Sequence, residues 1–373
     1  MKIMIVGGHV SPALAVIDSL PEAWEVVFIG RKYAFEGDTA LSLEYQEIHK
    51  RSIPFLPLTT ARVQRSLSKH TLPSFAKFPY GFYQAVAYLR KEKPDVVLSF
   101  GGYLSVPVGY AAKILSIPLV IHEQTLEAGL ANKLLGKVAT RICISWQPSE
   151  KFFPKNKVIL TGNPVKRFAT SELPFSFKDK KLPLLYITGG STGSHAINKL
   201  VSDTLTDLLT IFRVIHQTGD ASPHHDFDKL ANKRGKFPEE IGDRYKIEKF
   251  ISPAVIGSIM REATLVVSRS GINTISELLY FGKPALLIPL PSGQHNEQLK
   301  NARFLKEVGL AEILPQENAT GEKLVAGLQK MLIRRQAYAA RAAYAQQLIH
   351  SDAAENIIKT ITYVVRKTGS QEK

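Results

Sequence analysis

Short runs of consecutive apolar residues alternate with amphipathic stretches through the first half of the chain. The runs fall at residues 2–6, 26–30, 95–100, 118–123 and 141–145, and their apolar positions are consecutive, with no polar–apolar alternation. Strands of a parallel sheet have this composition because helices cover both faces of the sheet. The amphipathic stretches between the runs are typical of such helices. This half is therefore predicted to form a doubly wound α/β domain.

The same alternation begins again after about residue 160. A polar segment at residues 172–181 contains proline and phenylalanine, as linkers do, and an apolar run at residues 182–190 then leads into a glycine turn. Four more candidate strands follow, with helical stretches between them: FRVIHQTG, YKIEKFI, TLVVSRSG and PALLIPL. From about residue 322 the pattern is helical and rich in alanine. The predicted fold class is α/β, with two Rossmann-like doubly wound domains.

Composition limits the classes of protein to which the chain can belong. The 373 residues, 45% of them hydrophobic, are enough to bury two cores. The single cysteine, Cys143, excludes a disulfide framework and fits a reducing compartment. No uninterrupted apolar run approaches the ~18 residues that span a bilayer, so we expect a soluble or peripheral protein.

The charge indicates anionic partners. Lysine and arginine number 48 against 33 aspartate and glutamate, a net charge of +15. Zinc-finger spacing, RNP-like aromatic motifs and arginine-rich tracts are absent from the sequence, so no nucleic acid is expected as a partner. Residues 65–83 contain four phenylalanines or tyrosines between Phe75 and Phe82, together with Lys69 and Lys77. This segment is either a patch that docks on an anionic membrane or a loop and helix that pack aromatic rings on the first domain.

Two glycine turns follow predicted strands. In the second half, residues 189–194 (GGSTGS) lie between a strand and a helix, where glycines allow close approach and helix amides favour a diphosphate. In the first half, Gly7 and Gly8 precede His9, at the carboxyl end of the first strand, where α/β sheets bind ligands. A histidine there is a candidate general base, or simply a turn residue. Each glycine turn taken singly has packing as its alternative role.

Two further groups of polar residues also follow strands. One strand ends in Arg269, Ser270 and Gly271, and Glu277 follows on the second turn of the next helix. A carboxylate there suits bidentate acceptance from the two ribose hydroxyls; the alternative is that Glu277 is an ordinary surface residue. Residues 294–301 (QHNEQLKN) follow another strand and are rich in amides that can bind sugar hydroxyls. Metal-ligand spacing, a Gly-x-Ser-x-Gly elbow, a Walker loop and Gly-x-Gly-x-x-Gly are all absent from the sequence. No metal site or NAD cofactor is therefore expected.

Nine motifs in one order resemble the MurG family, UDP-N-acetylglucosamine:undecaprenyl-diphospho-muramoylpentapeptide N-acetylglucosaminyltransferase. The resemblance covers roughly residues 1–314. The motifs are GGHVSPALAV, GGYLSVP, HEQ followed by GLANK, GNPVK, GGSTGS with Asn198, HQTG, SRSGINTISEL, GKPALLIPLP and EQLKNA. Each motif is modest by itself, but their order and spacing are specific.

The resemblance implies a GT-B fold with two Rossmann-like domains. An acceptor and membrane-association domain is expected at residues 1–165 and a UDP-sugar donor domain at 166–339, with a last helix at about 340–366 that packs back on the first domain. The implied reaction moves GlcNAc from UDP-GlcNAc to the C4 hydroxyl of the lipid-linked muramoyl-pentapeptide acceptor, with inversion and without a metal or other cofactor. It converts lipid I to lipid II in peptidoglycan synthesis, and so contributes to cell-wall biogenesis, cell shape and cell division. The implied location is the cytoplasmic face of the cell membrane, as a peripheral protein.

The resemblance also implies roles for residues at matching positions. His9 is the candidate base and Glu123 the second catalytic candidate. Ile251 resembles the residue whose backbone binds uracil, Glu277 the ribose ligand and Gln298 the ligand of sugar hydroxyls. The other expected donor-binding residues are Lys166, Ser191, Thr192, Gly193, Arg269, Ser270 and Gly271. The expected acceptor-binding residues are Gly7, Gly8, Tyr103, Gln124 and Thr125.

The chain departs from the family pattern at four places. Gly7-Gly8-His9 replaces a longer GGxGGH loop, and Thr125, Lys166 and Glu297 replace an amide, an arginine, and a histidine or glutamine. Lysine keeps the charge of arginine but loses its bidentate geometry. Two alternatives to a MurG-type enzyme remain. One is a GT-B transferase with a different lipid-linked acceptor, and the other is a non-catalytic UDP-sugar-binding protein at the membrane. The presence together of His9 and Glu277, one from each half, favours an enzyme.

Overall fold

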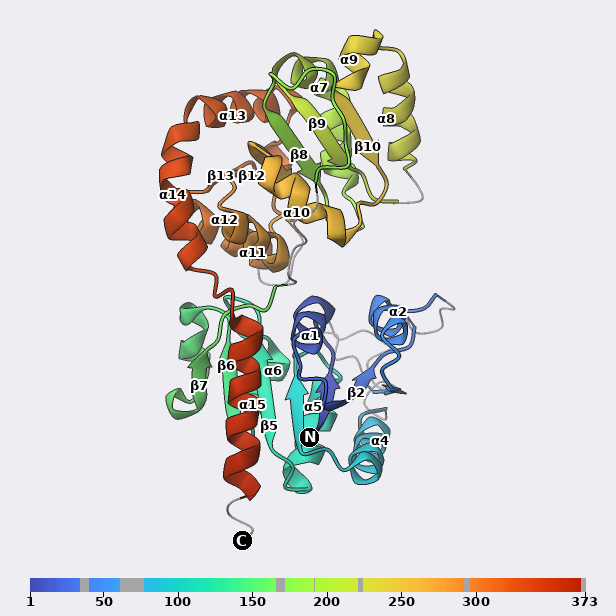
Figure 1. Ribbon diagram of the computed structural model, residues 1–373, viewed down its shortest axis with the longest axis vertical. Helices are drawn as coiled ribbons and strands as arrows, with labels where there is room; N and C mark the ends of the chain where they lie inside the picture. Colours follow the sequence, from blue (N-terminus) through green and yellow to red (C-terminus); the bar gives the residue numbers. More distant parts are fainter. Residues whose placement is uncertain are drawn as a thin grey trace. The chain divides into compact units, whose positions relative to one another are not determined.

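The structure is a computed structural model that describes residues 1–33, 40–60, 77–165, 172–190, 192–220, 224–291 and 296–369. The chain divides into two compact units, one of residues 1–166 with 350–373 and one of residues 167–349. Each unit contains a parallel sheet with helices around it (Figure 1). The predicted fold class, two Rossmann-like doubly wound α/β domains, is confirmed.

The sheet of the first unit has seven parallel strands in the order β3-β2-β1-β4-β5-β6-β7. Its strands are β1 (Lys2–Val6), β2 (Glu25–Gly30), β3 (Phe55–Pro57), β4 (Val96–Ser99), β5 (Leu119–Glu123), β6 (Arg141–Ile144) and β7 (Val158–Leu160). Its helices are α1 (Val10–Ile17), α2 (Leu43–Lys50), α4 (Lys77–Glu92), α5 (Ser105–Ile114), α6 (Leu130–Gly136), α15 (Ala353–Gly369) and the 3-10 turns η1 (Gln147–Phe152) and η2 (Lys155–Lys157).

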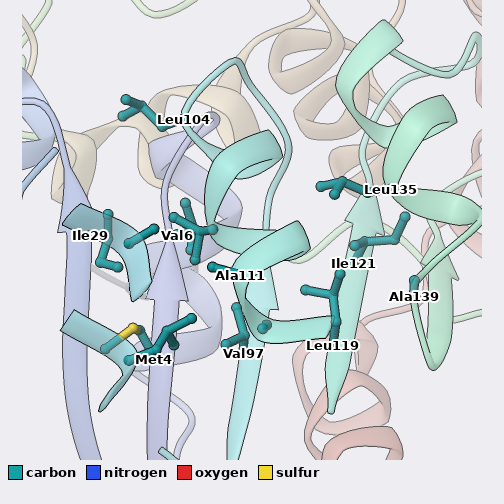
Figure 2. Close-up of a cluster of buried hydrophobic side chains, with 14 of the residues drawn as sticks. Met4, Val6, Ile29, Val97, Leu104, Ala111, Leu119, Ile121, Leu135 and Ala139 are labelled. Atoms are coloured by element: carbon teal, nitrogen blue, oxygen red, sulfur yellow. The ribbon is translucent and has the colours of Figure 1, made fainter. Parts of the chain in front are cut away.

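The strands of this sheet are buried on both faces, as their continuous apolar runs predicted. Met4 and Val6 point into a core that α4, α5 and α6 cover, and Figure 2 shows their side chains among those of neighbouring strands. Ile3 and Ile5 point the other way, into a second core. Successive side chains of a strand alternate between faces, so a strand covered on both sides needs apolar residues at every position.

Helix α15 completes the second core of the first unit. Its residues Ile357, Ile361 and Val364 pack against the same face of the sheet as α1. Their spacing of three to four residues forms the apolar stripe of an amphipathic helix. The last helix of the chain is thus part of the unit that contains β1.

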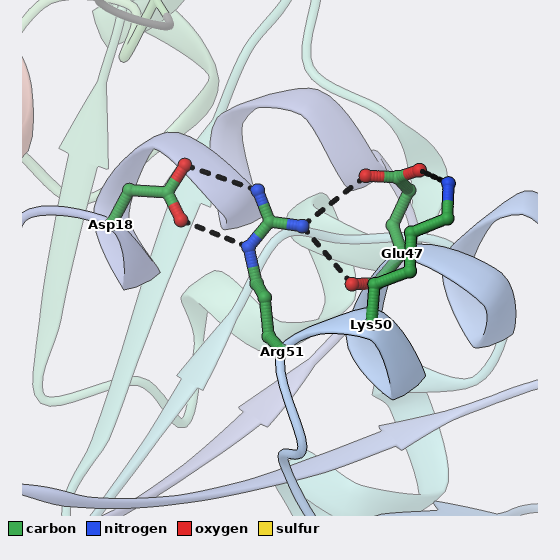
Figure 3. A network of polar contacts seen from close by, with 4 residues as sticks. All are labelled: Asp18, Glu47, Lys50 and Arg51. Atoms are coloured by element: carbon green, nitrogen blue, oxygen red, sulfur yellow. Dashed lines mark hydrogen bonds and ion pairs between the residues drawn. The ribbon is translucent and has the colours of Figure 1, made fainter.

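Arg51, which directly follows α2, ties α2 to the end of α1 (Figure 3). Its guanidinium donates to both carboxylate oxygens of Asp18 at 2.9 and 3.2 Å, and to the Glu47 carboxylate at 3.2 Å. Lys50 lies 2.7 Å from Glu47, and the bonds from Lys50 and Arg51 hold the pKa of Glu47 below its ordinary value against the opposing effect of burial. The far end of α1, the helix that begins after His9, is therefore anchored.

The sheet of the second unit has six parallel strands in the order β10-β9-β8-β11-β12-β13. Its strands are β8 (Leu184–Thr188), β9 (Arg213–Gln217), β10 (Tyr245–Glu248), β11 (Leu265–Ser268), β12 (Ala285–Leu287) and β13 (Ala311–Ile313). Its helices are α7 (His195–Ile211), α8 (Asp226–Gly235), α9 (Glu239–Asp243), α10 (Pro253–Glu262), α11 (Ile272–Phe281), α12 (Glu297–Val308), α13 (Gly321–Ile333), α14 (Arg335–Gln347) and the 3-10 turn η4 (Gln316–Asn318).

The division between the units differs from the expected one at the end of the chain. The helix expected over about 340–366 is two helices, and α14 belongs to the second unit while α15 belongs to the first. A Cβ atom at Gly282 would lie 2.8 Å from Cβ of Ala342, and Gln346 donates to the Tyr280 carbonyl at 3.3 Å. These contacts hold α14 against the end of α11, so the chain changes unit after Ile349.

Candidate active site

His9 and the glycine turn at residues 189–194 lie at the switch points of the two sheets. In the first sheet β1 lies between β2 and β4, and in the second β8 lies between β9 and β11, so the chain leaves the first strand toward one side and returns on the other. Loops after the two central strands diverge there, and α/β sheets bind ligands in the space they leave. His9 follows β1, and the turn at residues 189–194 follows β8.

Close backbone contacts explain the glycines at the first switch point. A Cβ atom on Gly8 would lie 2.1 Å from the Gly101 carbonyl oxygen, and one on Gly102 would lie 2.9 Å from the Gly8 Cα. Gly101 and Gly102 have φ of +77° and +80°, values that side chains disfavour. Gly7 donates its amide hydrogen to the Ile29 carbonyl at 3.1 Å. Gly7 and Gly8 thus let the loops after β1 and β4 touch.

His9 is the N-cap residue of α1. Its backbone is extended and its side chain makes no capping hydrogen bond, so the imidazole is not committed to the helix. Although His9 is exposed at the surface, the protein around its imidazole partly removes the ring from water and lowers its pKa from the ordinary value, and the Glu123 carboxylate acts in the opposite direction. The imidazole is therefore neutral near pH 7, which is the form that accepts a proton.

Glu123, the last residue of β5, is 2% exposed. Its carboxylate accepts four hydrogen bonds, from the Thr125 amide and hydroxyl, the Gly129 amide and the Asn132 side chain, at 2.7 to 3.0 Å. These four hydrogen bonds fix the carboxylate in place, and through them it organises residues 124–132.

Of the expected acceptor-binding residues, Thr125 bonds directly to this carboxylate. Thr125 stands where the family usually has an amide side chain. Its hydroxyl lies 2.7 Å from the Glu123 carboxylate and 2.5 Å from the Glu127 carbonyl oxygen, so the position keeps a polar side chain with two local partners. Gln124 is buried, and its carbonyl accepts from the Trp146 indole at 2.9 Å. Tyr103 is half-buried in the loop after β4 and packs against the first core.

The glycine turn of the second unit is built by similar contacts. Gly190 and Gly193 have φ of +88° and +78°, and a Cβ atom on Gly193 would lie 2.0 Å from the Thr218 carbonyl oxygen. Thr192 is exposed between them, and Ser194 caps α7 by accepting from the Ile197 amide. The first amides of α7 point toward the turn, as an anion site requires. Ser191 and Lys166 lie outside the described residues.

Ile251 follows β10, on the same edge of the sheet as the glycine turn. Its side chain is buried, and its amide donates to Oε1 of Gln217 at 3.3 Å. Nε2 of Gln217 donates to the Gly190 carbonyl at 2.9 Å. One carboxamide thus connects the glycine turn to the segment that contains Ile251.

The loop after β11 contains the other expected donor residues. The Arg269 guanidinium donates to the Ile288 carbonyl at 2.9 Å and to Oε1 of Gln316 at 2.6 Å, and burial lowers its pKa. The Ser270 hydroxyl donates to the Gln298 carbonyl at 2.7 Å, which joins this loop to α12. Gly271 is the N-cap residue of α11. No carboxylate of a described residue forms an ion pair with Arg269.

Glu277 lies on the second turn of α11 and is half-buried. Burial raises its pKa to about 7, and no hydrogen bond joins its carboxylate to another described residue. Its charge also acts on Tyr186 of β8, whose pKa is raised chiefly by burial. A carboxylate without partners near the switch point is ready to accept hydrogen bonds from a ligand.

Gln298 has one end of its carboxamide fixed. Its Oε1 accepts from the Leu290 amide at 3.0 Å, which leaves the Nε2 hydrogens for another acceptor, such as a sugar hydroxyl. In the part of the chain that the structure describes, no group of three or more histidine, cysteine, aspartate or glutamate residues could hold a metal ion.

Sequence reasoning gave no role to the buried polar residues beneath the glycine turn. Asn198 donates to the Thr218 carbonyl at 3.0 Å, and His216 lies 3.1 Å from the Asn198 side chain and 2.8 Å from the Tyr245 hydroxyl. Burial lowers the pKa of His216 to about 3, so this imidazole is neutral. The HQTG motif was the signal for His216 and Gln217, because polar residues at the end of a buried strand require partners.

Two Rossmann-like units, with a glycine turn after the central strand of the second and a Glu277 carboxylate that has no hydrogen-bond partner among the described residues, are typical of nucleotide-sugar-dependent glycosyltransferases of the GT-B class. Residues 6–144 match the glycosyltransferase family 28 N-terminal domain, and residues 184–357 match the C-terminal domain of that family.

Sequence relatives agree over nearly the whole chain. A protein of Lachnospira eligens named UDP-N-acetylglucosamine–N-acetylmuramyl-(pentapeptide) pyrophosphoryl-undecaprenol N-acetylglucosamine transferase is 33% identical over 371 residues, 96% of this chain and 98% of that protein. A protein of the same name from Treponema denticola is 35% identical over 319 residues, 83% of this chain and 81% of that protein. The crystal structure of MurG from Acinetobacter baumannii has a TM-score of 0.72 and 26% identity, and covers 97% of this chain and 99% of that one.

The chain belongs to glycosyltransferase family 28 and, within it, to the MurG family of N-acetylglucosamine transferases. The family, the GT-B fold and the enzyme class predicted from the sequence are confirmed. The glycosyltransferase CalG4, at 14% identity and a TM-score of 0.72, shares the fold alone.

Proposed function

We propose that this chain transfers GlcNAc from UDP-GlcNAc to the C4 hydroxyl of undecaprenyl-diphospho-MurNAc-pentapeptide, converting lipid I to lipid II with inversion at the anomeric carbon. The names of its relatives include both the N-acetylglucosamine that is transferred and the muramyl-pentapeptide pyrophosphoryl-undecaprenol acceptor. The observation that carries the proposal for this chain is the Glu277 carboxylate, which has no hydrogen-bond partner among the described residues and lies on the helix after β11, the strand next to β8 and its glycine turn. That pairing suits a ligand with both a ribose and a diphosphate.

The donor is proposed to bind along the strand ends of the second unit. The glycine turn with Ser191, Thr192 and Gly193 and the start of α7 take the diphosphate, with Lys166 as an additional cation. The backbone at Ile251 takes the base. Glu277 accepts from the ribose hydroxyls, and the free Nε2 of Gln298 donates to a sugar hydroxyl.

Arg269 is proposed to stabilise the departing UDP. Its guanidinium bonds to two neutral oxygens in the described part of the chain, so its charge is not neutralised by a carboxylate there. A half-buried cation of this kind favours an anionic ligand. As the bond from the anomeric carbon to the β-phosphate oxygen breaks, UDP keeps the electron pair, and a nearby positive charge lowers the energy of that state.

His9 is proposed as the general base. The neutral imidazole takes the proton of the C4 hydroxyl while that oxygen forms its bond to the anomeric carbon. Glu123 contributes as a fixed negative charge that favours the imidazolium formed in this step, and it shapes residues 124–132 for the acceptor. Tyr103, Gln124 and Thr125, with Gly7 and Gly8, form the proposed acceptor side of the first unit.

The face of the first unit covered by α4, α5 and α6 is proposed to dock on the cytoplasmic surface of the membrane. On α4, Tyr80 and Tyr83 are 54% and 72% exposed, whereas Phe82 packs on the first core, so tyrosines are the exposed rings of the expected aromatic patch. Phe75, also expected in that patch, lies outside the described residues.

The neighbouring helix α6 adds a stripe of apolar and basic side chains. Leu130 and Leu134 are exposed beside Lys133 and Lys137, at the spacing of one helix face. Apolar side chains at the interface with lysines toward lipid phosphate are the composition of a peripheral anchor. None of the helices in the described ranges combines the length and apolar character needed to cross a membrane.

The test is transfer of label. The chain is incubated with radiolabelled UDP-GlcNAc and a lipid I analogue, and labelled lipid is extracted and counted; His9→Ala and Glu277→Ala variants serve as controls. Label in the lipid fraction that both variants reduce is the expected result. A parent protein that binds UDP-GlcNAc but labels no lipid I analogue has a different acceptor, and one that binds no UDP-GlcNAc overturns the proposal.

A further inference from the structure

A glycine turn binds a diphosphate only if its carbonyl oxygens face away from the phosphates. In this turn the Gly190 carbonyl accepts from the Gly193 amide at 3.1 Å and from Nε2 of Gln217 at 2.9 Å. Gly190 has φ of +88°, and its amide donates to the Thr188 hydroxyl at 3.0 Å. The orientation of this peptide group therefore depends on a side chain from the next strand.

Gln217 is the last residue of β9, the strand between β8 and β10, and it is 3% exposed. The other end of its carboxamide accepts from the Ile251 amide, in the loop after β10, at 3.3 Å. One buried amide side chain therefore bonds to both loops that flank its own strand. Glutamine suits this position because its side chain offers a donor and an acceptor at opposite ends.

The residues next to Gln217 are themselves fixed. The Thr218 carbonyl accepts from Asn198 of α7, and His216 bonds to Asn198 and Tyr245. A Cβ atom on Gly219 would lie 2.4 Å from the Gly193 Cα, so the loop after β9 is also packed against the glycine turn. The end of β9 is thus a rigid base from which Gln217 reaches both loops.

We propose that Gln217 is a positioning residue of the donor site, which holds the diphosphate turn and the base-binding segment at the one spacing that fits a nucleoside diphosphate. The inference rests on the proposed function, in which the turn takes the diphosphate and the Ile251 segment takes the base. A ligand that occupies both places depends on their spacing, whereas a nucleoside does not. Loss of the carboxamide therefore weakens UDP more than uridine.

The experiment measures the dissociation constants of UDP and uridine by titration calorimetry for the parent, Gln217→Met and Gln217→Glu. Gln346→Met is the matched control, because it removes another glutamine side chain that donates to a backbone carbonyl of the same unit. Methionine keeps the length of glutamine but makes neither bond. UDP affinity of Gln217→Met is expected to fall about 5- to 50-fold, the range for losing one or two hydrogen bonds, and uridine affinity less than about 1.5-fold.

Gln217→Glu supplies a measurement that a merely structural role would not affect. Its ionised carboxylate accepts from the Ile251 amide but repels the Gly190 carbonyl. The protonated carboxyl donates and accepts as the carboxamide does. Burial raises the pKa of such a carboxyl, so UDP affinity, relative to the parent at the same pH, is expected to recover between about pH 7.5 and about pH 5.5.

The outcomes are distinct. A preference for UDP over uridine that falls threefold or more in folded Gln217→Met, but not in Gln346→Met, supports the inference, and a smaller fall overturns it while the proposed function stands. If Gln217→Met does not fold, the pH series of Gln217→Glu decides, and affinity that follows the parent at every pH overturns the inference. A parent protein that binds no UDP overturns both.

Discussion

Replacing Glu277 tests the donor site most directly, because its side chain has no other described partner. Burial raises the pKa of this carboxyl to about 7, and no hydrogen bond to a described residue offsets the cost of keeping it there. A group held at that cost in a folded protein indicates a ligand. Glu277→Ala removes the acceptor, and Glu277→Gln keeps the shape with a neutral group.

The magnitude follows from the bond that is lost. A hydrogen bond to a charged group contributes about 1.5–3 kcal/mol, and a tenfold change in affinity corresponds to about 1.4 kcal/mol. Glu277→Ala should therefore weaken UDP about 10- to 150-fold at pH 8, where the parent carboxylate is ionised. Because the native carboxyl holds its proton up to about pH 7, affinity of the parent for UDP should rise with pH and level off above that value.

The effect of Glu277 on stability has the opposite sign. An acid whose pKa is raised on folding costs stability once the unfolded chain ionises, so the cost grows from about pH 4.3 and is complete above the folded pKa. Glu277→Gln should therefore be more stable than the parent above pH 7 while it binds UDP less tightly. A substitution that only damaged the fold would lower both.

The assay is titration calorimetry with UDP and 2′-deoxy-UDP at pH 6 and pH 8. The parent should prefer UDP, and Glu277→Ala should lose most of that preference because the contact to the ribose hydroxyl is gone. Glu277→Gln should also lose the pH dependence. If folded Glu277→Ala discriminates between the two nucleotides as the parent does, Glu277 is not the ribose ligand.

Three further outcomes are expected. His9→Ala should lower kcat by about 10²- to 10⁴-fold with UDP affinity unchanged, and a variant with nearly full kcat would assign the base elsewhere. In the parent, kcat should fall only at pH values below the ordinary histidine pKa near 6.5, because the protein around the imidazole lowers the pKa of His9. Tyr80→Ser with Tyr83→Ser should reduce sedimentation with anionic liposomes, whereas Tyr344→Ser, an equally exposed tyrosine of the second unit, should not; equal losses would argue against a docking face. Arg51→Ala should lower the free energy of unfolding by about 0.5–1 kcal/mol, since its carboxylate partners are partly exposed; an unchanged midpoint in urea would show that this network contributes nothing.

The buried strands were predictable from the sequence because the signal is local. Continuous apolar runs located β1, β2, β4, β5 and β6, and the restart of the pattern located the second sheet. The short edge strands β3, β7 and β13 were not predicted. Each has three residues and a partner on one side only, so its pattern is too brief to distinguish it from a loop.

The glycine turns were also predictable, since adjacent glycines after an apolar run are visible in the sequence; the structure shows that a side chain at Gly8, Gly102 or Gly193 would collide with backbone. The role of Glu123 was not. A carboxylate after a strand suits catalysis as well as structure, and only its four hydrogen bonds show that it organises residues 124–132. Likewise, residues 77–83 contain both packed and exposed rings, and tertiary packing decided that Phe82 is partly buried against the core and Tyr83 is exposed.

The sequence by itself determined the two doubly wound sheets and the family, because apolar runs and the glycines that follow them are patterns of residues adjacent in the chain. Tertiary structure alone decided which polar side chains meet. Gln217 bonds to Gly190 and Ile251, which are 27 and 34 positions away in sequence. Helix α14 packs with α11 in the second unit, whereas α15, the last helix, belongs to the first unit. Hydrogen bonds and side-chain packing act over a few ångströms in space, and distance along the chain does not reveal which residues the fold brings that close.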